Sequence, residues 1–162
     1  MYYSAKYDSP VGLLTLISTE TALAAILWAN DHSERVKLPG SGLVESEPDI
    51  LKMTIQQLSE YFGRERRAFD LPLTLHGTNF QQQVWNALLQ IPFGQTMSYG
   101  QLAKQLGNPD ASRAVGAANG KNPISIVVPC HRVVGNNGNL TGFAGGVEVK
   151  RQLLWHEQSL LF

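Results

Sequence analysis

The stretch Asn122-Pro-Ile-Ser-Ile-Val-Val-Pro-Cys-His-Arg-Val-Val134 says more about the fold and chemistry of this chain than any other. Its run of β-prone apolar residues, 124–128, predicts a buried strand. That strand would deliver the chain into Pro129 and then into the triplet Cys-His-Arg at 130–132. We therefore expect the end of this strand to present Cys130, the one cysteine of the sequence.

Cys130 is a candidate nucleophile. A thiol attacks as its thiolate, and an ordinary cysteine with a pKa of about 8.5 is mostly protonated at neutral pH. The imidazole of His131 and the guanidinium of Arg132 follow directly in sequence, and they could supply a base and a positive field. A second interpretation stays open from these residues alone, in which Cys130 is a buried and inert side chain.

Three short helices are predicted upstream of this stretch. Thr78 and Gln81 have the spacing of a capping box, and the helix that they begin ends before Pro92. The second helix spans 98–106, with a glycine following it. The third spans 108–120, with asparagine as N-cap, proline at the first helical position and glycine at the end. The last two outline a helix-turn-helix, although the outline alone fits an ordinary helical hairpin better.

The third helix consists almost entirely of small residues, as 111–119 reads Ala-Ser-Arg-Ala-Val-Gly-Ala-Ala-Asn. It lacks the several long polar side chains with which a helix reads base edges in the major groove. Small residues instead permit close approach to a packed neighbour or to the narrow minor groove of DNA. Arg113, which we expect to be exposed, favours the minor groove.

The N-terminal part is predicted as strands followed by a helix. The apolar segments 13–17 and 23–28 flank a polar break, which is typical of a hairpin. The polar segment 31–47 is expected to be a loop. From Pro48 at the first helical position, apolar residues spaced three and four apart predict a helix that ends at Gly63. These apolar residues are Leu51, Ile55, Leu58 and Phe62.

Length and composition restrict the class of protein. The chain has 162 residues, of which 43% are hydrophobic and 16% charged, so a folded core is expected. We find no apolar run of membrane-spanning length and no signal peptide, and we expect a cytoplasmic protein. One cysteine excludes an intramolecular disulfide, and the four histidines are scattered, so no metal and no cofactor is expected.

Charge is distributed unevenly although the formal net charge is zero. Residues 1–79 carry seven basic and ten acidic side chains, whereas residues 80–162 carry six basic and three acidic ones. The second half is therefore the part suited to an anionic partner such as nucleic acid.

Residues 122–134 and four further segments resemble the O6-alkylguanine-DNA alkyltransferases, the DNA-repair proteins that transfer an alkyl group to their own cysteine. The resemblance covers most of residues 79–158, while the N-terminal half is similar only in size and layout. The four segments occur in the family's order: Ser98-Tyr-Gly-Gln-Leu-Ala103, Ala111-Ser-Arg-Ala-Val-Gly-Ala-Ala118, Gly142-Phe-Ala-Gly-Gly146 and Leu153-Leu-Trp-His-Glu157.

The resemblance implies an α/β protein of two domains. Residues 1–75 would form a ribonuclease H-like sheet-plus-helix domain. Residues 76–162 would form a mainly helical domain with a helix-turn-helix, which binds DNA and carries the cysteine. The expected partner is double-stranded DNA with alkylated bases, bound through the minor groove by a monomer, without a cofactor or a metal.

The resemblance also implies a role for each catalytic residue. Cys130 would take the alkyl group as thiolate, and His131 would accept its proton through a bound water. Glu157 would hydrogen-bond His131 and fix its tautomer. Asn122 would brace the turn before the cysteine strand. Tyr99 would donate to the guanine ring and offset the charge that develops on the leaving group.

Further residues are expected to contact DNA and the reacting base. Arg113 would fill the gap left by a flipped nucleotide, and the loop 138–146 would wall the base pocket. The other expected DNA contacts are Ser112, Ala114, Ala118, Tyr99 and Arg132. The other expected substrate contacts are Tyr99, Val133, Phe143, Ala144 and Lys150. Phe143 and Ala144 stand where family members often carry Tyr and Ser, which reduces hydrogen bonding to the base.

The implied reaction is a single irreversible transfer to Cys130, from O6 of guanine and also from O4 of thymine, after base flipping. One alternative is a protein that recognises lesions without repairing them, as in relatives that have Trp at the cysteine position. Another alternative is a cysteine hydrolase, because Cys130, His131 and Glu157 would serve such an enzyme as well.

Overall fold

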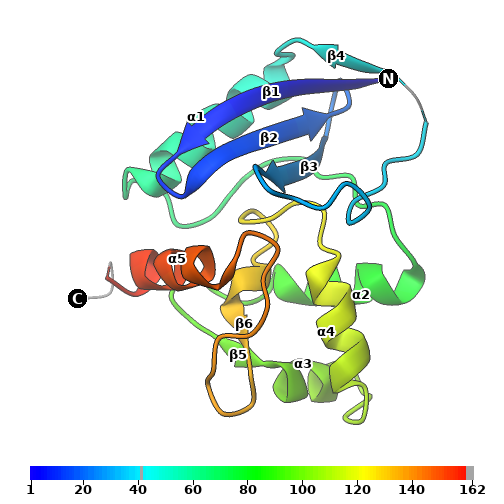
Figure 1. Cartoon of the computed structure of the whole chain (residues 1–162), viewed down its shortest axis with the longest axis vertical. Helices are drawn as coiled ribbons and strands as arrows, with labels where there is room; N and C mark the ends of the chain where they lie inside the picture. The colour runs from blue at the N-terminus through cyan, green and yellow to red at the C-terminus, as the bar shows by residue number, and fades with distance from the viewer. Residues whose placement is uncertain (41, 160–162) are drawn as a thin grey trace. The chain divides into compact units, whose positions relative to one another are not determined.

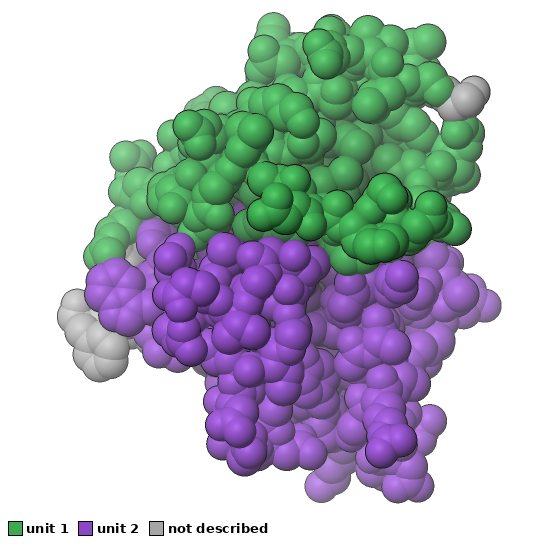
Figure 2. Space-filling view, in the orientation of Figure 1, with its two compact units in different colours: residues 1–76 green, residues 77–162 purple. Residues whose placement is uncertain are grey.

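The computed structural model describes residues 1–40 and 42–159, and the chain divides into two units, 1–76 and 77–162 (Figures 1 and 2). The first unit is a sheet with one helix, and the second is mainly helical. This layout confirms the predicted α/β class. Among the described residues, no helix combines the length and the apolar character needed to cross a membrane.

The first unit is built on a four-stranded sheet in the order β3-β2-β1-β4 (Figure 1). β1 pairs antiparallel with β2, β2 pairs antiparallel with β3, and β4 runs parallel to β1. The strands are β1 (Tyr2–Ser9), β2 (Gly12–Ser18), β3 (Leu23–Trp28) and β4 (Leu43–Glu45). The predicted hairpin is confirmed as β2 and β3. The prediction of a loop throughout 31–47 is wrong, because β4 lies within it and pairs through its backbone while its side chains stay exposed.

Helix α1 (Asp49–Phe62) packs against the strands of this sheet (Figure 1). The predicted end at Gly63 is confirmed, whereas Pro48 is the N-cap and not the first helical residue. The buried face includes two polar side chains that find backbone partners. Thr54 donates to the Ile50 carbonyl at 2.8 Å, and the Gln57 amide bonds the backbone of Asp70. Ile55 and Phe62, predicted on the apolar face, are only half-buried.

The second unit places short elements in quick succession (Figure 1). β5 and β6 pair in parallel, and α4 packs against both α2 and α3. The elements are α2 (Asn79–Leu88), β5 (Met97–Ser98), α3 (Tyr99–Gln105), α4 (Ser112–Gly120), the 3-10 turn η1 (Cys130–Arg132), β6 (Val133–Val134) and α5 (Val147–Ser159). The predicted capping box of Thr78 and Gln81 is confirmed at the start of α2.

Helix α4 begins later than predicted. Asn108, expected as its N-cap, donates its backbone N–H to the Ala103 carbonyl at 3.0 Å, and Gly107 adopts a φ of +82°. These features close the C-terminus of α3. Asn108 therefore belongs to the end of α3, and α4 starts only at Ser112.

Trp85 connects two helices of the second unit. Its ring is 1% exposed, and its Nε1 donates to the Ala118 carbonyl of α4 at 2.8 Å. Gly77 lies against the same ring, where an added Cβ would come within 2.4 Å of it. Only glycine lets the chain enter α2 along this path.

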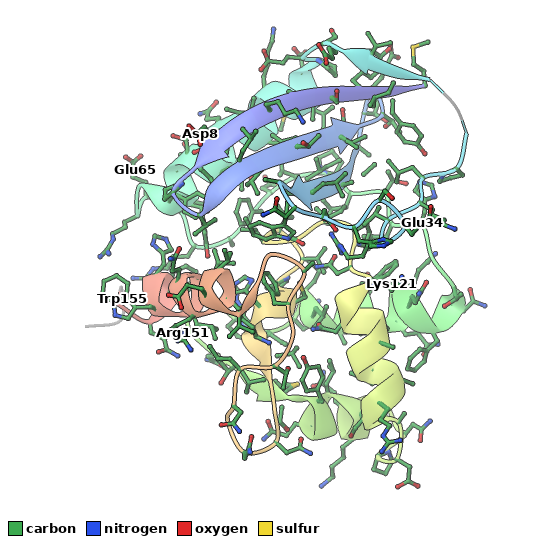
Figure 3. The ribbon with its side chains drawn as sticks, in the orientation of Figure 1. Asp8, Glu34, Glu65, Lys121, Arg151 and Trp155 are labelled. Atoms are coloured by element: carbon green, nitrogen blue, oxygen red, sulfur yellow. The ribbon has the colours of Figure 1, made fainter. Side chains whose placement is uncertain are left out.

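We predict that Trp85→Phe lowers the free energy of unfolding by about 1–3 kcal/mol, because the buried ring becomes smaller and the Ala118 carbonyl loses one of its two donors, keeping the Lys121 N–H. The control is Trp155→Phe on α5, where the ring is 65% exposed (Figure 3). It should cost less than about 0.5 kcal/mol. Urea denaturation followed by circular dichroism measures both variants, and equal losses would contradict the structural role of Trp85.

Candidate active site

Cys130 opens the 3-10 turn η1, with its side chain only 4% exposed. The segment before it is not a strand, so the prediction for 124–128 is wrong. The backbone N–H of Val128 donates to the Ile124 carbonyl at 2.9 Å, and Ile126 has a φ of +75°. This left-handed conformation is a genuine outlier for a β-branched residue. A tight turn, and not an extended strand, delivers the cysteine.

Asn122 explains why an apolar run folds as a turn. Its fully buried amide donates from Nδ2 to the Val128 carbonyl at 2.8 Å and accepts from the Ile124 N–H at 3.0 Å. One side chain thus supplies the donor and the acceptor that a neighbouring strand would provide. Asn119, near the end of α4, donates to the Cys130 carbonyl at 3.4 Å. Two asparagines therefore hold the backbone around the cysteine.

A buried network follows directly after the cysteine. Nε2 of His131 lies 2.7 Å from Oε2 of Glu157 on α5. The guanidinium of Arg132 donates from Nε to Oε1 of Glu157 at 2.8 Å and from Nη2 to Oε2 at 3.0 Å. Its Nη1 donates to the Ile91 carbonyl at 2.6 Å. One carboxylate therefore serves both residues that follow Cys130.

The charge of Glu157 determines which proton His131 holds. Burial works to raise the pKa of Glu157, but His131 and Arg132 together hold it well below its ordinary value. Because a carboxylate only accepts hydrogen bonds, Nε2 of His131 carries a proton. Nδ1 of His131 is buried and finds no hydrogen-bond partner in the described part of the chain. In the neutral ring, Nδ1 therefore keeps a lone pair that can accept a proton.

Lys150 interacts electrostatically with Cys130 and lies near the Tyr99 ring. It is fully buried, and its Nζ has no hydrogen-bond partner within residues 1–40 and 42–159. Burial lowers the pKa of Lys150, and the electrostatic interaction with Cys130 partly opposes that change. The same Nζ lies 6.0 Å from the centroid of the Tyr99 ring. An ammonium group at this position acts on both residues, because charges interact strongly away from bulk water.

A cavity of about 450 Å³ opens beside Tyr99. Its lining comes from α3, from α4 and from the loop between β6 and α5 (Figure 1): Tyr99, Ser112, Arg113, Gly116, Asn136, Thr141 and Gly142. In residues 1–40 and 42–159, no group of three or more His, Cys, Asp or Glu side chains could hold a metal ion.

The structure contradicts two of the expected DNA contacts. Arg132 is buried, and its guanidinium is held by Glu157 and by the Ile91 carbonyl. Ala118 lies on the buried face of α4, against Trp85. Neither side chain is available to a phosphate or a groove.

The remaining expected residues lie in the same unit. Arg113 and Ala114 are exposed on α4, and Ser112 beside them is half-buried. Phe143 and Ala144 are half-buried in the loop before α5, and Val133 is fully buried in β6. The sequence reasoning missed Asn119, Asn136 and Thr141, because isolated polar residues in a helix of small residues or in a loop give no periodic signal.

Comparison with known proteins gives matches over nearly the whole chain. Residues 1–75 match the family model described as 6-O-methylguanine DNA methyltransferase, ribonuclease-like domain, and residues 79–159 match its DNA binding domain. The chain is 46% identical to the methylated-DNA–protein-cysteine methyltransferase of Methanosarcina acetivorans, over 98% of this chain and 99% of that protein. A protein of the same name from Mycobacterium tuberculosis is also 46% identical, over 98% and 94%.

A solved structure is similar over the same length. The crystal structure of Mycobacterium tuberculosis OGT in complex with DNA superposes with a TM-score of 0.88 at 45% identity. The match covers 98% of this chain and 93% of that one. Both units of the fold are therefore shared with a protein that was crystallised on DNA.

We predict that Glu157→Gln lowers the free energy of unfolding by about 3–5 kcal/mol, because Arg132 would then be a buried cation without a counter-charge. The control is Glu148→Gln on the same helix, where the exposed carboxylate pairs with Arg151. It should cost less than about 1 kcal/mol. Urea titration of both variants measures the difference, and similar losses would contradict the assigned role of Glu157.

The same variant has a defined pH dependence. The pKa of Glu157 is lower in the folded than in the unfolded protein, so its stabilisation is complete above about pH 4.3 and is lost as the pH falls further. The stability difference between wild type and Glu157→Gln should therefore narrow as the pH falls from about 4.3 to about 3, by on the order of 1.4 kcal/mol per pH unit. A constant difference over that range would contradict a charged Glu157.

Proposed function

The chain belongs to the 6-O-methylguanine DNA methyltransferase family, and from that membership we propose that it repairs DNA by transferring alkyl groups to its own Cys130. The substrate is O6-alkylguanine, with O4-alkylthymine as a second lesion. The observation that carries the proposal is the buried network of His131, Glu157 and Arg132 directly after the single cysteine. That network supplies a proton acceptor beside a thiol.

The proposed reaction is a displacement at the alkyl carbon. His131 takes the Cys130 proton through a bound water, at the Nδ1 that the Glu157 hydrogen bond leaves as acceptor. The thiolate forms the carbon–sulfur bond while the bond from carbon to O6 breaks. Tyr99 donates to the purine as negative charge develops on it, and the buried Lys150 ammonium stabilises both anionic partners. Asn122 holds the turn that carries the cysteine.

DNA binding is proposed for the exposed side of α4. Arg113, Ser112 and Ala114 lie there, and the small residues of the helix suit the minor groove. A base inside the stack cannot reach the sulfur, so the damaged nucleotide flips out and Arg113 takes its place. The proposed contacts of the flipped base are Tyr99, Val133, Phe143, Ala144 and Lys150.

The proposed organisation keeps residues 1–75 as a ribonuclease-like domain and residues 76–162 as the DNA-binding and transfer domain, in a monomeric, cytoplasmic protein. A lesion-recognition protein without transfer and a cysteine hydrolase remain the competing functions. The fate of the Cys130 thiol distinguishes both functions from repair. Recognition alone leaves Cys130 unmodified, whereas a hydrolase turns over repeatedly.

We predict one methyl group per protein molecule. A thioether has no carbonyl for water to attack, so the protein has no hydrolytic route back to the thiol. With excess O6-methylguanine oligonucleotide, intact-protein mass should rise by one methyl, located in the peptide that contains Cys130. Cys130→Ser should bind the same DNA and transfer almost nothing, because a hydroxyl ionises far less readily. Transfer well beyond one equivalent, or mass on another peptide, would overturn the proposal.

We predict that Arg113→Ala slows repair of a paired lesion in duplex DNA by at least about tenfold, since extruding a base costs a few kcal/mol. Reaction with the free base O6-benzylguanine, which needs no flipping, should change by less than about twofold. Lys104→Ala, which removes an exposed cation from α3, is the control for general electrostatics. Equal losses on both substrates would place Arg113 in the base pocket or in the fold instead.

A further inference from the structure

The loop between β6 and α5 is attached to the first turn of α3 by two side-chain hydrogen bonds. The hydroxyls of Thr141 and Tyr99 lie 2.8 Å apart. Oδ1 of Asn136 accepts from the backbone N–H of Gly100 at 3.0 Å. A Cβ on Gly100 would approach that Oδ1 to 2.9 Å, so the glycine permits the second contact. Tyr99, Asn136 and Thr141 all line the cavity beside α3 and α4.

The contact between Thr141 and Tyr99 is special because either hydroxyl could be the donor. The phenol of Tyr99 has one proton and can donate only one hydrogen bond at a time. When Tyr99 donates to Thr141, it has no proton left for a ligand in the cavity. When Thr141 donates instead, the Tyr99 proton is released and its oxygen is still satisfied as an acceptor.

We propose that Thr141 is a positioning residue that directs the single Tyr99 proton toward the reacting base. The inference rests on the proposed function, in which Tyr99 donates to the purine. Thr141 donates to the phenol oxygen and Tyr99 donates to the base, which makes a chain of two hydrogen bonds. Each bond in such a chain polarises the next, so the phenol becomes a better donor as charge develops on the leaving purine.

The neighbouring contact provides a matched comparison. Asn136 attaches the same loop to the adjacent residue of the same helix, but its partner there is the backbone N–H of Gly100 and not the Tyr99 hydroxyl. If the loop only forms a wall of the cavity, then the loss of either contact should slow transfer whether or not the Tyr99 hydroxyl is present. If Thr141 acts through Tyr99, then the effect of removing the Thr141 hydroxyl should depend on the Tyr99 phenol, and the effect of removing the Asn136 contact should not.

The test is a double-mutant cycle on the single-turnover rate of methyl transfer from an O6-methylguanine duplex to Cys130. Thr141→Val removes the hydroxyl and keeps the branched shape, and it should slow transfer about 3- to 10-fold, the value of one hydrogen bond. Thr141→Ser restores the hydroxyl and should return the rate to within about twofold of wild type. In a Tyr99→Phe background, Thr141→Val should change the rate by less than about twofold.

The control for the loop is Asn136→Ala, whose effect on the rate should be the same in wild type and in Tyr99→Phe. An equal loss from Thr141→Val in both backgrounds, or no loss in wild type, would overturn the role of Thr141. A failure of Thr141→Ser to recover the rate would also overturn it. A wild-type protein that gains no methyl on Cys130 would overturn the proposed function, and this inference with it.

Discussion

The second unit depends on the hydrogen bonds that the carboxylate of Glu157 accepts. This carboxylate is buried on α5, and it holds the two residues that follow Cys130. A buried cation needs a counter-charge, and Glu157 supplies it to Arg132, which also reaches the Ile91 carbonyl beyond α2. The same contact fixes the His131 ring. The contact that joins α5 to η1 therefore also fixes which nitrogen of the histidine carries the proton.

Local signals in the sequence predicted the elements whose causes are local. The capping box of Thr78 and Gln81 and the glycine after α1 satisfy helix ends within a few residues, so their patterns could be recognised. The β2–β3 hairpin was visible because both strands are strongly apolar. β4 was not, since only its backbone pairing with β1 maintains it.

The candidate site was predictable in its residues and less so in its backbone. The sequence itself pointed to Cys130 and His131, and family resemblance added Glu157, but apolar residues before the cysteine suggested a strand. No local pattern reveals that one amide, that of Asn122, replaces a strand neighbour. Arg132 was expected to contact DNA, and its burial depends on a carboxylate 25 residues away. Tertiary pairing decided both outcomes.

The near-complete burial of Cys130 has a consequence for how long each molecule stays usable. A protein that reacts once is consumed by any electrophile or oxidant that reaches its sulfur, and oxidation of a thiol follows its exposure. The surrounding turn and helices leave little of the sulfur accessible to small reagents in solution. Burial of the sulfur thereby limits its reactions while no lesion is bound. The fold therefore keeps protein molecules unreacted until they meet damaged DNA.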